Sequence, residues 1–172
     1  MRRHVLNGPR WSVVWTYGVF LGCLLFLYTV LRTSVVREYV AQPLAIAVTF
    51  LSGWVLNLLS LKATASGTVL SVEGFTARID DVCTGIFVAA IYVSAVLAYP
   101  SRVKEKLKGL GLGVSAILFL NLIRVISLMY VGRYFPSFFE TAHLLIWQSL
   151  IIFATLLVWL YWTQRFVGAP QH

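Results

Sequence analysis

Residues 109–131 read GLGLGVSAILFLNLIRVISLMYV, an apolar run that contains one charged side chain, Arg124. About 20 apolar residues cross the hydrocarbon core of a bilayer, so this run predicts a transmembrane helix. Asn121 lies almost one turn before Arg124 on the same helix face, so both polar groups are expected to point into a bundle. A charge at this depth costs about 3 kcal/mol by insertion scales, which makes Arg124 a candidate functional residue. The alternatives are an arginine that snorkels to the headgroups or pairs structurally with Asp80 or Asp81.

The whole chain has the composition of a membrane protein. Of its 172 residues, 59% are hydrophobic and 12% are charged, and no soluble domain of this size buries so much apolar surface. We therefore expect one integral membrane domain over residues 1–172. The net charge of +8 is expected to face the cytoplasm and anionic lipid, and not nucleic acid, because no DNA- or RNA-reading motif accompanies it.

Other apolar runs predict further helices. Ser12–Leu31, Val82–Tyr99 and His143–Trp162 each approach the length of a membrane span. Val40–Leu61 carries a weak polar stripe at helical spacing and is either a full span or an amphipathic helix in the outer leaflet. The expected fold class is an all-α membrane protein, a compact bundle of four to five transmembrane helices.

Residues 62–80 form the one stretch with a β pattern. Thr68–Val72 and Phe75–Ile79 flank Glu73-Gly74, which predicts a hairpin with a two-residue turn. Irregular backbone is costly in lipid, so we expect this hairpin outside the hydrocarbon core, immediately before Cys83.

The basic residues predict the orientation. The basic segment Ser101–Lys108 should be cytoplasmic, which places the hairpin and the predicted loop Gly132–Ala142 outside and the tail Gln164–His172 inside. If Val40–Leu61 spans fully, the basic end Met1–Arg10 lies outside, against the charge rule. If that run lies in the outer leaflet, the amino terminus is inside.

Three polar residues then converge on the outer face. Cys83 opens one run, Arg124 lies late in the next, and His143 opens the last, while consecutive spans alternate in direction. A thiol nucleophile needs a base that titrates near neutrality, and His143 is the histidine outside the terminal segments. Arg124 would hold the thiolate or stabilise an oxyanion. The alternative is a structural cysteine and an interfacial histidine.

The residues next to Cys83 fit this interpretation. The first turn of a helix offers N–H groups that stabilise a thiolate, and Asp80 or Asp81 can cap that turn. Their charge would raise the pKa of the thiol, so a cation must offset it. Thr84 and Gly85 are small and leave the sulfur open to a substrate backbone.

Other classes of site lack their motifs. The sequence has no zinc-protease helix motif, no paired intramembrane aspartates and no phosphate-binding loop. Cys23 and Cys83 have no metal-ligand spacing, so we expect neither metal nor cofactor. Gly111 and Gly113 are expected to allow close helix packing. The remaining alternatives are a small transporter with Arg124 as a gate and a non-catalytic assembly protein.

At these residues the sequence resembles the exosortase/archaeosortase family of membrane sorting enzymes. That family combines a Cys-Ser/Thr-Gly motif after a hairpin, an Asn-x-x-Arg motif in a following helix, and a single later His. Here they stand as Cys83-Thr84-Gly85, Asn121-Leu122-Ile123-Arg124 and His143. The chain is shorter than typical members, which suggests a compact subclass such as exosortase H. Trp147 stands where the family often has Gly.

The resemblance implies a cysteine endopeptidase or transpeptidase in the bacterial inner membrane, with its active site toward the periplasm or exterior. Its partners would be membrane lipid and exported proteins whose carboxy-terminal signals carry a short motif, a transmembrane helix and a basic tail. Cys83 would be the nucleophile, Arg124 the essential cation and His143 the acid/base. The supporting residues would be Thr84, Gly85, Asn121 and Asp81. The recognised motif, the acceptor and the oligomeric state stay open.

Overall fold

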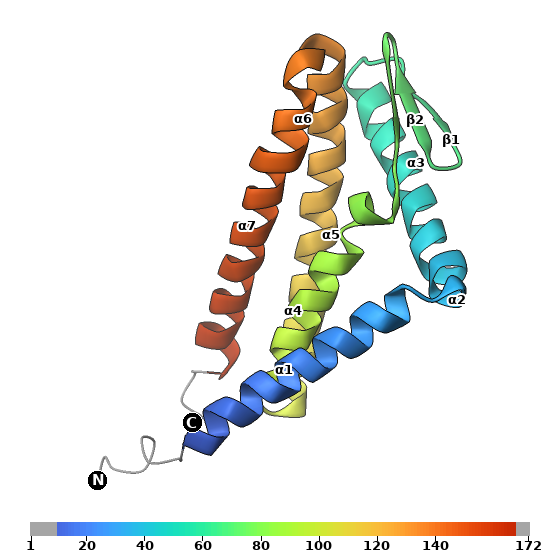
Figure 1. The fold of residues 1–172 in the computed structure, drawn as a ribbon. Coiled ribbons are helices and arrows are strands. Elements are labelled where there is room, and N and C mark those ends of the chain that lie inside the picture. Colours follow the sequence, from blue (N-terminus) through green and yellow to red (C-terminus); the bar gives the residue numbers. More distant parts are fainter. Residues whose placement is uncertain (1–9, 168–172) are drawn as a thin grey trace.

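The structure is a computed structural model that describes residues 10–167 and, at residues 10–12, 81 and 82, the backbone alone. It is a bundle of long helices with a small sheet packed against one end (Figure 1). Within residues 10–167, four helical stretches are long and apolar enough to cross a membrane, which confirms the predicted all-α membrane fold with a short hairpin. These stretches are Val13–Leu31, Ser34–Leu58, Val103–Tyr134 and Pro136–Val167.

The first two helices differ in how they join the bundle. Helix α1 (Arg10–Leu31) crosses the bundle obliquely and leans on α4 (Figure 1). Helix α2 (Ser34–Val36) continues through a π-helical turn, Arg37–Ala41, into α3 (Gln42–Leu58). At 1.5 Å per residue this continuous helix is about 37 Å long, so by length alone it could cross a membrane. Val13 and Trp15 at the start of α1 line one cavity with Tyr99 and Pro100, so the start of α1 lies at the same end of the bundle as the basic segment.

Helix α4 (Ile86–Ala98) is shorter than the span predicted from residue 82. It starts after Gly85, whose left-handed backbone (φ 79°) separates it from the preceding 3₁₀ turn. Its 13 residues rise about 20 Å, less than the ~30 Å hydrocarbon core. Its amino-terminal end therefore stops at mid-height of the neighbouring helices (Figure 1).

Helix α5 (Val103–Tyr134) is longer than predicted at both ends. The backbone N–H of Arg102 donates to the Glu105 carboxylate at 2.9 Å, which caps the start of the helix and places most of the basic segment inside it. At the other end the helix continues into the predicted loop 132–142, which is itself largely helical.

The last helical run also begins earlier than His143. A 3₁₀ turn, Pro136–Phe138, leads into α6 (Phe139–Thr141) and a π-helical turn. Proline suits a first helical turn because its φ is fixed and its missing N–H needs no partner. Helix α7 (Trp147–Trp162) and a final π-helical turn, Thr163–Val167, complete the run. Residues 1–9, whose side of the membrane the sequence leaves open, and residues 168–172 of the tail expected inside lie outside the described residues.

The sheet has three antiparallel strands in the order β1-β2-β3. Strands β2 (Val69–Val72) and β3 (Phe75–Arg78) form the predicted hairpin around Glu73-Gly74, with Val72 opposite Phe75. Strand β1 (Thr64–Ser66) was not predicted, because Thr-Ala-Ser carries no apolar alternation. It pairs with β2 from Thr64↔Ser71 to Ser66↔Val69.

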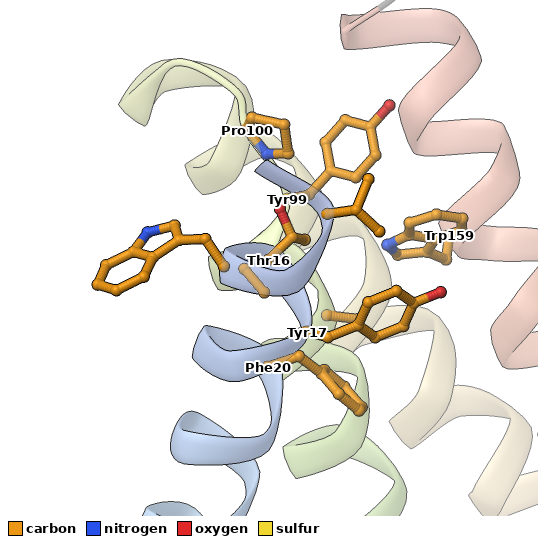
Figure 2. A pocket seen from close by; sticks show the side chains of 10 residues that line it. Thr16, Tyr17, Phe20, Tyr99, Pro100 and Trp159 are labelled. Atoms are coloured by element: carbon orange, nitrogen blue, oxygen red, sulfur yellow. The ribbon is translucent and has the colours of Figure 1, made fainter. Parts of the chain in front are cut away.

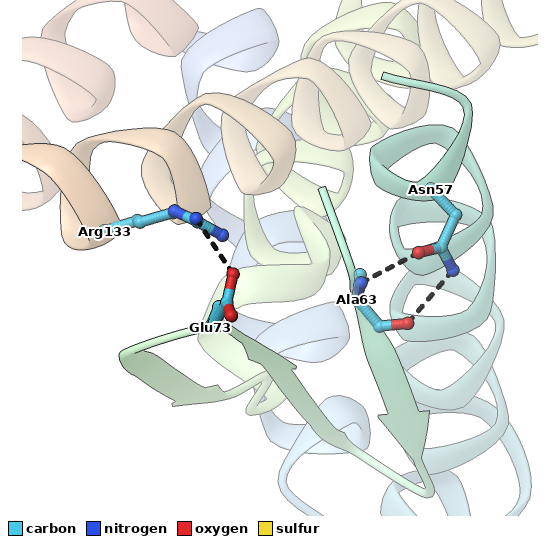
Figure 3. A network of polar contacts seen from close by, with 4 residues as sticks. All are labelled: Asn57, Ala63, Glu73 and Arg133. Carbon is cyan, nitrogen blue, oxygen red and sulfur yellow. Dashed lines mark hydrogen bonds and ion pairs between the residues drawn. The ribbon is translucent and has the colours of Figure 1, made fainter. Parts of the chain in front are cut away.

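The sheet is fixed to the bundle by apolar packing and by two polar contacts. Leu70 and Val72 of β2 are buried in a cluster with side chains of α3 and α5. The Asn57 side chain donates to and accepts from the backbone of Ala63, at 3.0 and 2.8 Å. Arg133 of α5 forms a 3.1 Å ion pair with Glu73 at the hairpin turn (Figure 3). The hairpin therefore has a defined height relative to α5.

A second apolar cluster holds the opposite end of the bundle. Tyr92 and Trp162 are fully buried there, and each donates a hydrogen bond to a backbone carbonyl, of Gly109 and Glu105 respectively. Beside it lies an apolar cavity of about 640 Å³ between α1, α4 and α7 (Figure 2). Tyr17, Tyr99 and Trp159 are among its lining residues, none of which belongs to the predicted site.

Candidate active site

Cys83 lies in a 3₁₀ turn, Asp81–Thr84, between β3 and α4. Its backbone N–H donates to the carbonyl of Asp80 at 2.8 Å. Asp80 occupies the N-cap position, yet its side chain makes no capping hydrogen bond. The expectation that Cys83 sits in the first turn of the membrane helix is therefore wrong: Gly85 ends the turn first, and α4 starts after it.

Asn121 holds this turn against α5. Its side-chain amide donates to the carbonyl of Cys83 at 2.6 Å, and the residue is fully buried. Its Cβ and Cγ lie 3.3 Å from the place where a Cβ on Gly85 would stand. Both the left-handed backbone and this close approach require glycine at position 85.

Arg124 is buried, with 4% of its surface exposed. It lies ten residues before the end of α5 at Tyr134, which corresponds to about 15 Å along the helix axis. Its Nε has no hydrogen-bond partner, and among the described side chains no carboxylate pairs with it. A snorkelling arginine would be exposed, and a structural ion pair with Asp80 would bring their charged groups together, so neither of these alternatives fits. The side chain of Asp81, the other predicted partner, lies outside the described part of the chain.

His143 reaches the thiol from the last helical run. Its Nε2 lies 3.9 Å from the Sγ of Cys83. The residue belongs to the π-helical turn Ala142–Ile146, a distortion that often marks functional sites. The ring of Phe139, four residues earlier, stacks on the imidazole with 5.8 Å between centroids and 20° between planes.

The three predicted residues line one cavity of about 350 Å³ between β3, α5 and the start of the last helical run. Burial raises the pKa of the Cys83 thiol, the Arg124 guanidinium lowers it, and so does the hydrogen bond from the backbone at Asp80; the Asp80 charge raises it. The net effect is upward, so the resting sulfur is a thiol. The lining residues are Phe75, Thr76, Ala77, Arg78, Ile79, Asp80, Cys83, Arg124, Val125, Leu128, Met129, Phe139 and His143.

The sequence profile described as transmembrane exosortase matches residues 8–165. The chain belongs to this family. The resemblance read from three short motifs is thereby confirmed, and so is a multi-pass membrane protein of the sorting-related protease or transpeptidase class. Neither the curated proteins nor the solved structures gave a match.

The other predicted residues of this exosortase support the turn more than they line the cavity. Thr84 is fully buried, and its hydroxyl accepts a long hydrogen bond of 3.4 Å from the N–H of Ile86. Gly85 and Asn121 pack on each other beneath the thiol. The side chain of Asp81 lies outside the part of the chain that the structure describes. Within that part, no group of three His, Cys, Asp or Glu side chains could hold a metal ion.

Two features of the site were not predicted. The ring of Phe139 stacks on the imidazole of His143. Residues four apart are neighbours on a helix, so the sequence indicates this contact only if the helix starts before His143. Strand β3 forms one wall of the cavity. The sequence predicts this strand but gives no sign that its edge faces the thiol, because that depends on how the sheet docks on α5.

Proposed function

We propose that this exosortase is a membrane-embedded cysteine protease or transpeptidase with Cys83 as nucleophile, His143 as acid/base and Arg124 as the cation of the site. The observation that carries the proposal is the 3.9 Å contact between Cys83 Sγ and His143 Nε2 in a cavity that Arg124 also lines. A nucleophile and a base within reach of each other are the minimum for covalent acyl transfer.

The raised pKa of Cys83 indicates how the reaction begins. Since the resting sulfur carries its proton, His143 removes that proton as the sulfur attacks a substrate carbonyl. The tetrahedral intermediate then collapses, the C–N bond breaks, and the imidazolium returns the proton to the leaving amine. A thioester on Cys83 remains, which water or an acceptor amine resolves to give hydrolysis or transfer.

Arg124 has a separate task in this proposal. Its buried Nε without a partner leaves one N–H donor available at the site. A preorganised cationic donor stabilises the negative charge that develops on the attacked carbonyl oxygen, and it does so more strongly away from water. The same charge lowers the pKa of the thiol, so it also assists formation of the nucleophile.

The substrates in this proposal are exported proteins with a carboxy-terminal short motif, a transmembrane helix and a basic tail, cut at the extracytoplasmic face. The lysines at positions 104, 106 and 108 lie in the first turns of α5, and Arg124 and the sheet lie toward its other end. Basic residues favour the cytoplasmic side, so the thiol belongs to the opposite half of the bilayer. Helix α4 is short, so the thiol lies in a recess below the sheet, near the place where a substrate helix would enter the membrane.

Processing of such a substrate tests the proposal. An epitope-tagged exported protein with this tail, from the same genome, is expressed with wild-type enzyme or with Cys83→Ala, Arg124→Gln or His143→Gln. We expect processing to fall by about 10³-fold or more without the nucleophile, since the residues of such a set act as a unit. Cys23→Ala, which removes the other free cysteine, should process normally. Normal processing by an inserted Cys83→Ala enzyme would overturn the proposal.

A further inference from the structure

Strand β3 is the edge of the sheet nearest to the thiol. Residues 75–80 all line the cavity of Cys83, although alternate side chains of a strand point to opposite faces. A cavity that meets both sets of side chains lies along the edge of the strand. No residue of β1 or β2 lines this cavity, so the edge in question is the one turned away from the sheet.

The backbone groups at this edge follow from the register. Ile79 donates its N–H to the carbonyl of Thr68 at 2.8 Å, and hydrogen-bonded pairs alternate along an antiparallel ladder. Ala77 and Phe75 are therefore bonded to β2, whereas the N–H and C=O groups of Thr76 and Arg78 point outward. Among the described residues, no strand pairs with β3 on that side.

We propose that the substrate binds as an extended strand that adds to the free edge of β3, with its backbone bonded to Thr76 and Arg78. This inference rests on the proposed function of Cys83. An edge strand with unpaired backbone groups is a template for pairing with a peptide. Backbone pairing would align a peptide beside the nucleophile largely independently of the peptide's side chains.

The direction of the bound peptide also follows. Strand β3 runs from the hairpin turn toward Cys83, and α4 then continues toward the other end of the bundle (Figure 1). A substrate with its exported part outside and its carboxy-terminal helix in the membrane must pass the thiol in the same sense. The substrate strand therefore lies parallel to β3, with the residues before the cut beside Arg78 and Thr76.

Two pools of reagents test whether the substrate adds as a strand and whether it runs parallel to β3. Neither test needs knowledge of the recognised motif. One consists of acetylated hexapeptides, randomised but without proline, that end in a chloromethyl ketone; the other carries a chloroacetyl group at the amino end. In both, the sulfur displaces chloride, a C–S bond forms and the thiol proton leaves. The rate of Cys83 labelling is measured with Cys23→Ala enzyme in nanodiscs. For each pool, this rate is divided by the rate for the matching single-residue reagent, and the ratio is the peptide gain.

We expect the chloromethyl ketone pool to gain at least about tenfold from its peptide, and the chloroacetyl pool to gain little. When one backbone nitrogen of the chloromethyl ketone peptides is methylated at a time, the gain should be lost at every second position and kept at the positions between. The reason is that only alternate N–H groups of a strand face the neighbouring strand. An equal effect of methylation at all positions, or no gain from the peptide, would overturn strand addition. A gain in the chloroacetyl pool alone would overturn the parallel direction.

Variants of the strand give an independent measurement. Thr76→Pro removes an outward N–H, which proline tolerates at an edge, and should reduce the peptide gain at least fivefold. Ala65→Pro makes the same change on β1, where the N–H of Ala65 points away from β2. This variant should keep the gain in labelling rate that the peptide gives. Iodoacetamide reports the thiol site alone: because His143 is the proposed base, His143→Gln should slow the labelling of Cys83, and an unchanged rate would refute the proposed function. A labelling rate that depends on His143, with no peptide gain, would refute strand addition only.

Discussion

Asn121 donates its side-chain amide to the backbone carbonyl of Cys83 at 2.6 Å, and the same side chain fills the space over Gly85. One residue of α5 thus fixes the height of the thiol turn. Arg124 follows three residues later on α5, so a single helix positions both the proposed nucleophile and the proposed cation. The Asn-x-x-Arg motif and the Cys-Thr-Gly motif therefore contact each other directly, through Asn121 of the first and Cys83 and Gly85 of the second.

This contact predicts that Gly85→Ala is more damaging than an ordinary glycine substitution. A left-handed backbone costs a non-glycine residue about 1–2 kcal/mol, and here the new Cβ would also press on Asn121 at 3.3 Å. Gly74→Ala is the matched control, since φ is 85° there and no described atom lies within 4 Å of the added Cβ. Processing of the substrate and thermal unfolding in detergent check the pair, and equal losses would contradict the packing role of Gly85.

Asn121→Ala should destabilise the fold, because it leaves the partly buried carbonyl of Cys83 without its donor. A fully buried group left unsatisfied costs about 1–3 kcal/mol, so we expect a loss toward the lower end of that range. Ser52→Ala is the control: Ser52 is also fully buried, but its hydroxyl has no hydrogen-bond partner among the described residues, so its removal should cost little. The free energy of unfolding, measured by denaturant titration in mixed micelles, should fall for the first variant and change much less for the second.

The membrane class, the hairpin turn at Glu73-Gly74 and the family were predictable because each depends on local pattern: hydropathy, turn chemistry and short motifs. The meeting of Cys83 and His143 was predictable from the alternation of spans. The alternation of spans predicts only that the two residues lie at the same membrane face. The structure adds the distance between Cys83 Sγ and His143 Nε2, which is 3.9 Å.

The errors concern places where tertiary packing overrides local pattern. Apolarity cannot distinguish a residue inside a helix from one in a turn before it, so the break at Gly85 was missed and α4 was predicted too long. The basic segment 101–108 and the predicted loop 132–142 are polar or aromatic, so hydropathy gives no sign that they are helical. In the structure most of each segment is helical, because Glu105 caps the start of α5 and Pro136 starts the last helical run.

The reactivity of Cys83 should depend on pH in a way that reveals Arg124. Burial raises the pKa of this thiol, so alkylation by iodoacetamide should increase with pH and reach its plateau above the range of an exposed cysteine. Arg124 lowers the pKa, so Arg124→Gln should move the profile to higher pH. Arg133→Gln, on the same helix but paired with Glu73, should leave it in place. A shift to lower pH in Arg124→Gln would contradict the electrostatic role.

The ion pair between Arg133 and Glu73 should contribute little to stability. Its side chains are 23% and 65% exposed, and exposed pairs of this kind are worth about 0–1 kcal/mol. A double-mutant cycle with Arg133→Gln and Glu73→Gln should give a coupling energy in that range, which falls with added salt. A coupling well above 1 kcal/mol would mean that the pair, and not the apolar cluster around Leu70, holds the sheet on α5.

Gly111 and Gly113 of α5 were both expected to allow close helix packing, but only Gly113 does. A Cβ there would stand 2.0 Å from the ring of Tyr92, whereas no described atom lies within 4 Å of one at Gly111. The Tyr92 hydroxyl also donates to the carbonyl of Gly109, so its ring cannot move away without losing that bond. Gly113→Ala should therefore destabilise the protein by about 1–3 kcal/mol through overpacking, while Gly111→Ala should be neutral or slightly stabilising. Thermal unfolding of the two variants in the same detergent provides the comparison. A fall for Gly111→Ala as large as that for Gly113→Ala would show that another surface packs on the face of α5 that carries Gly111.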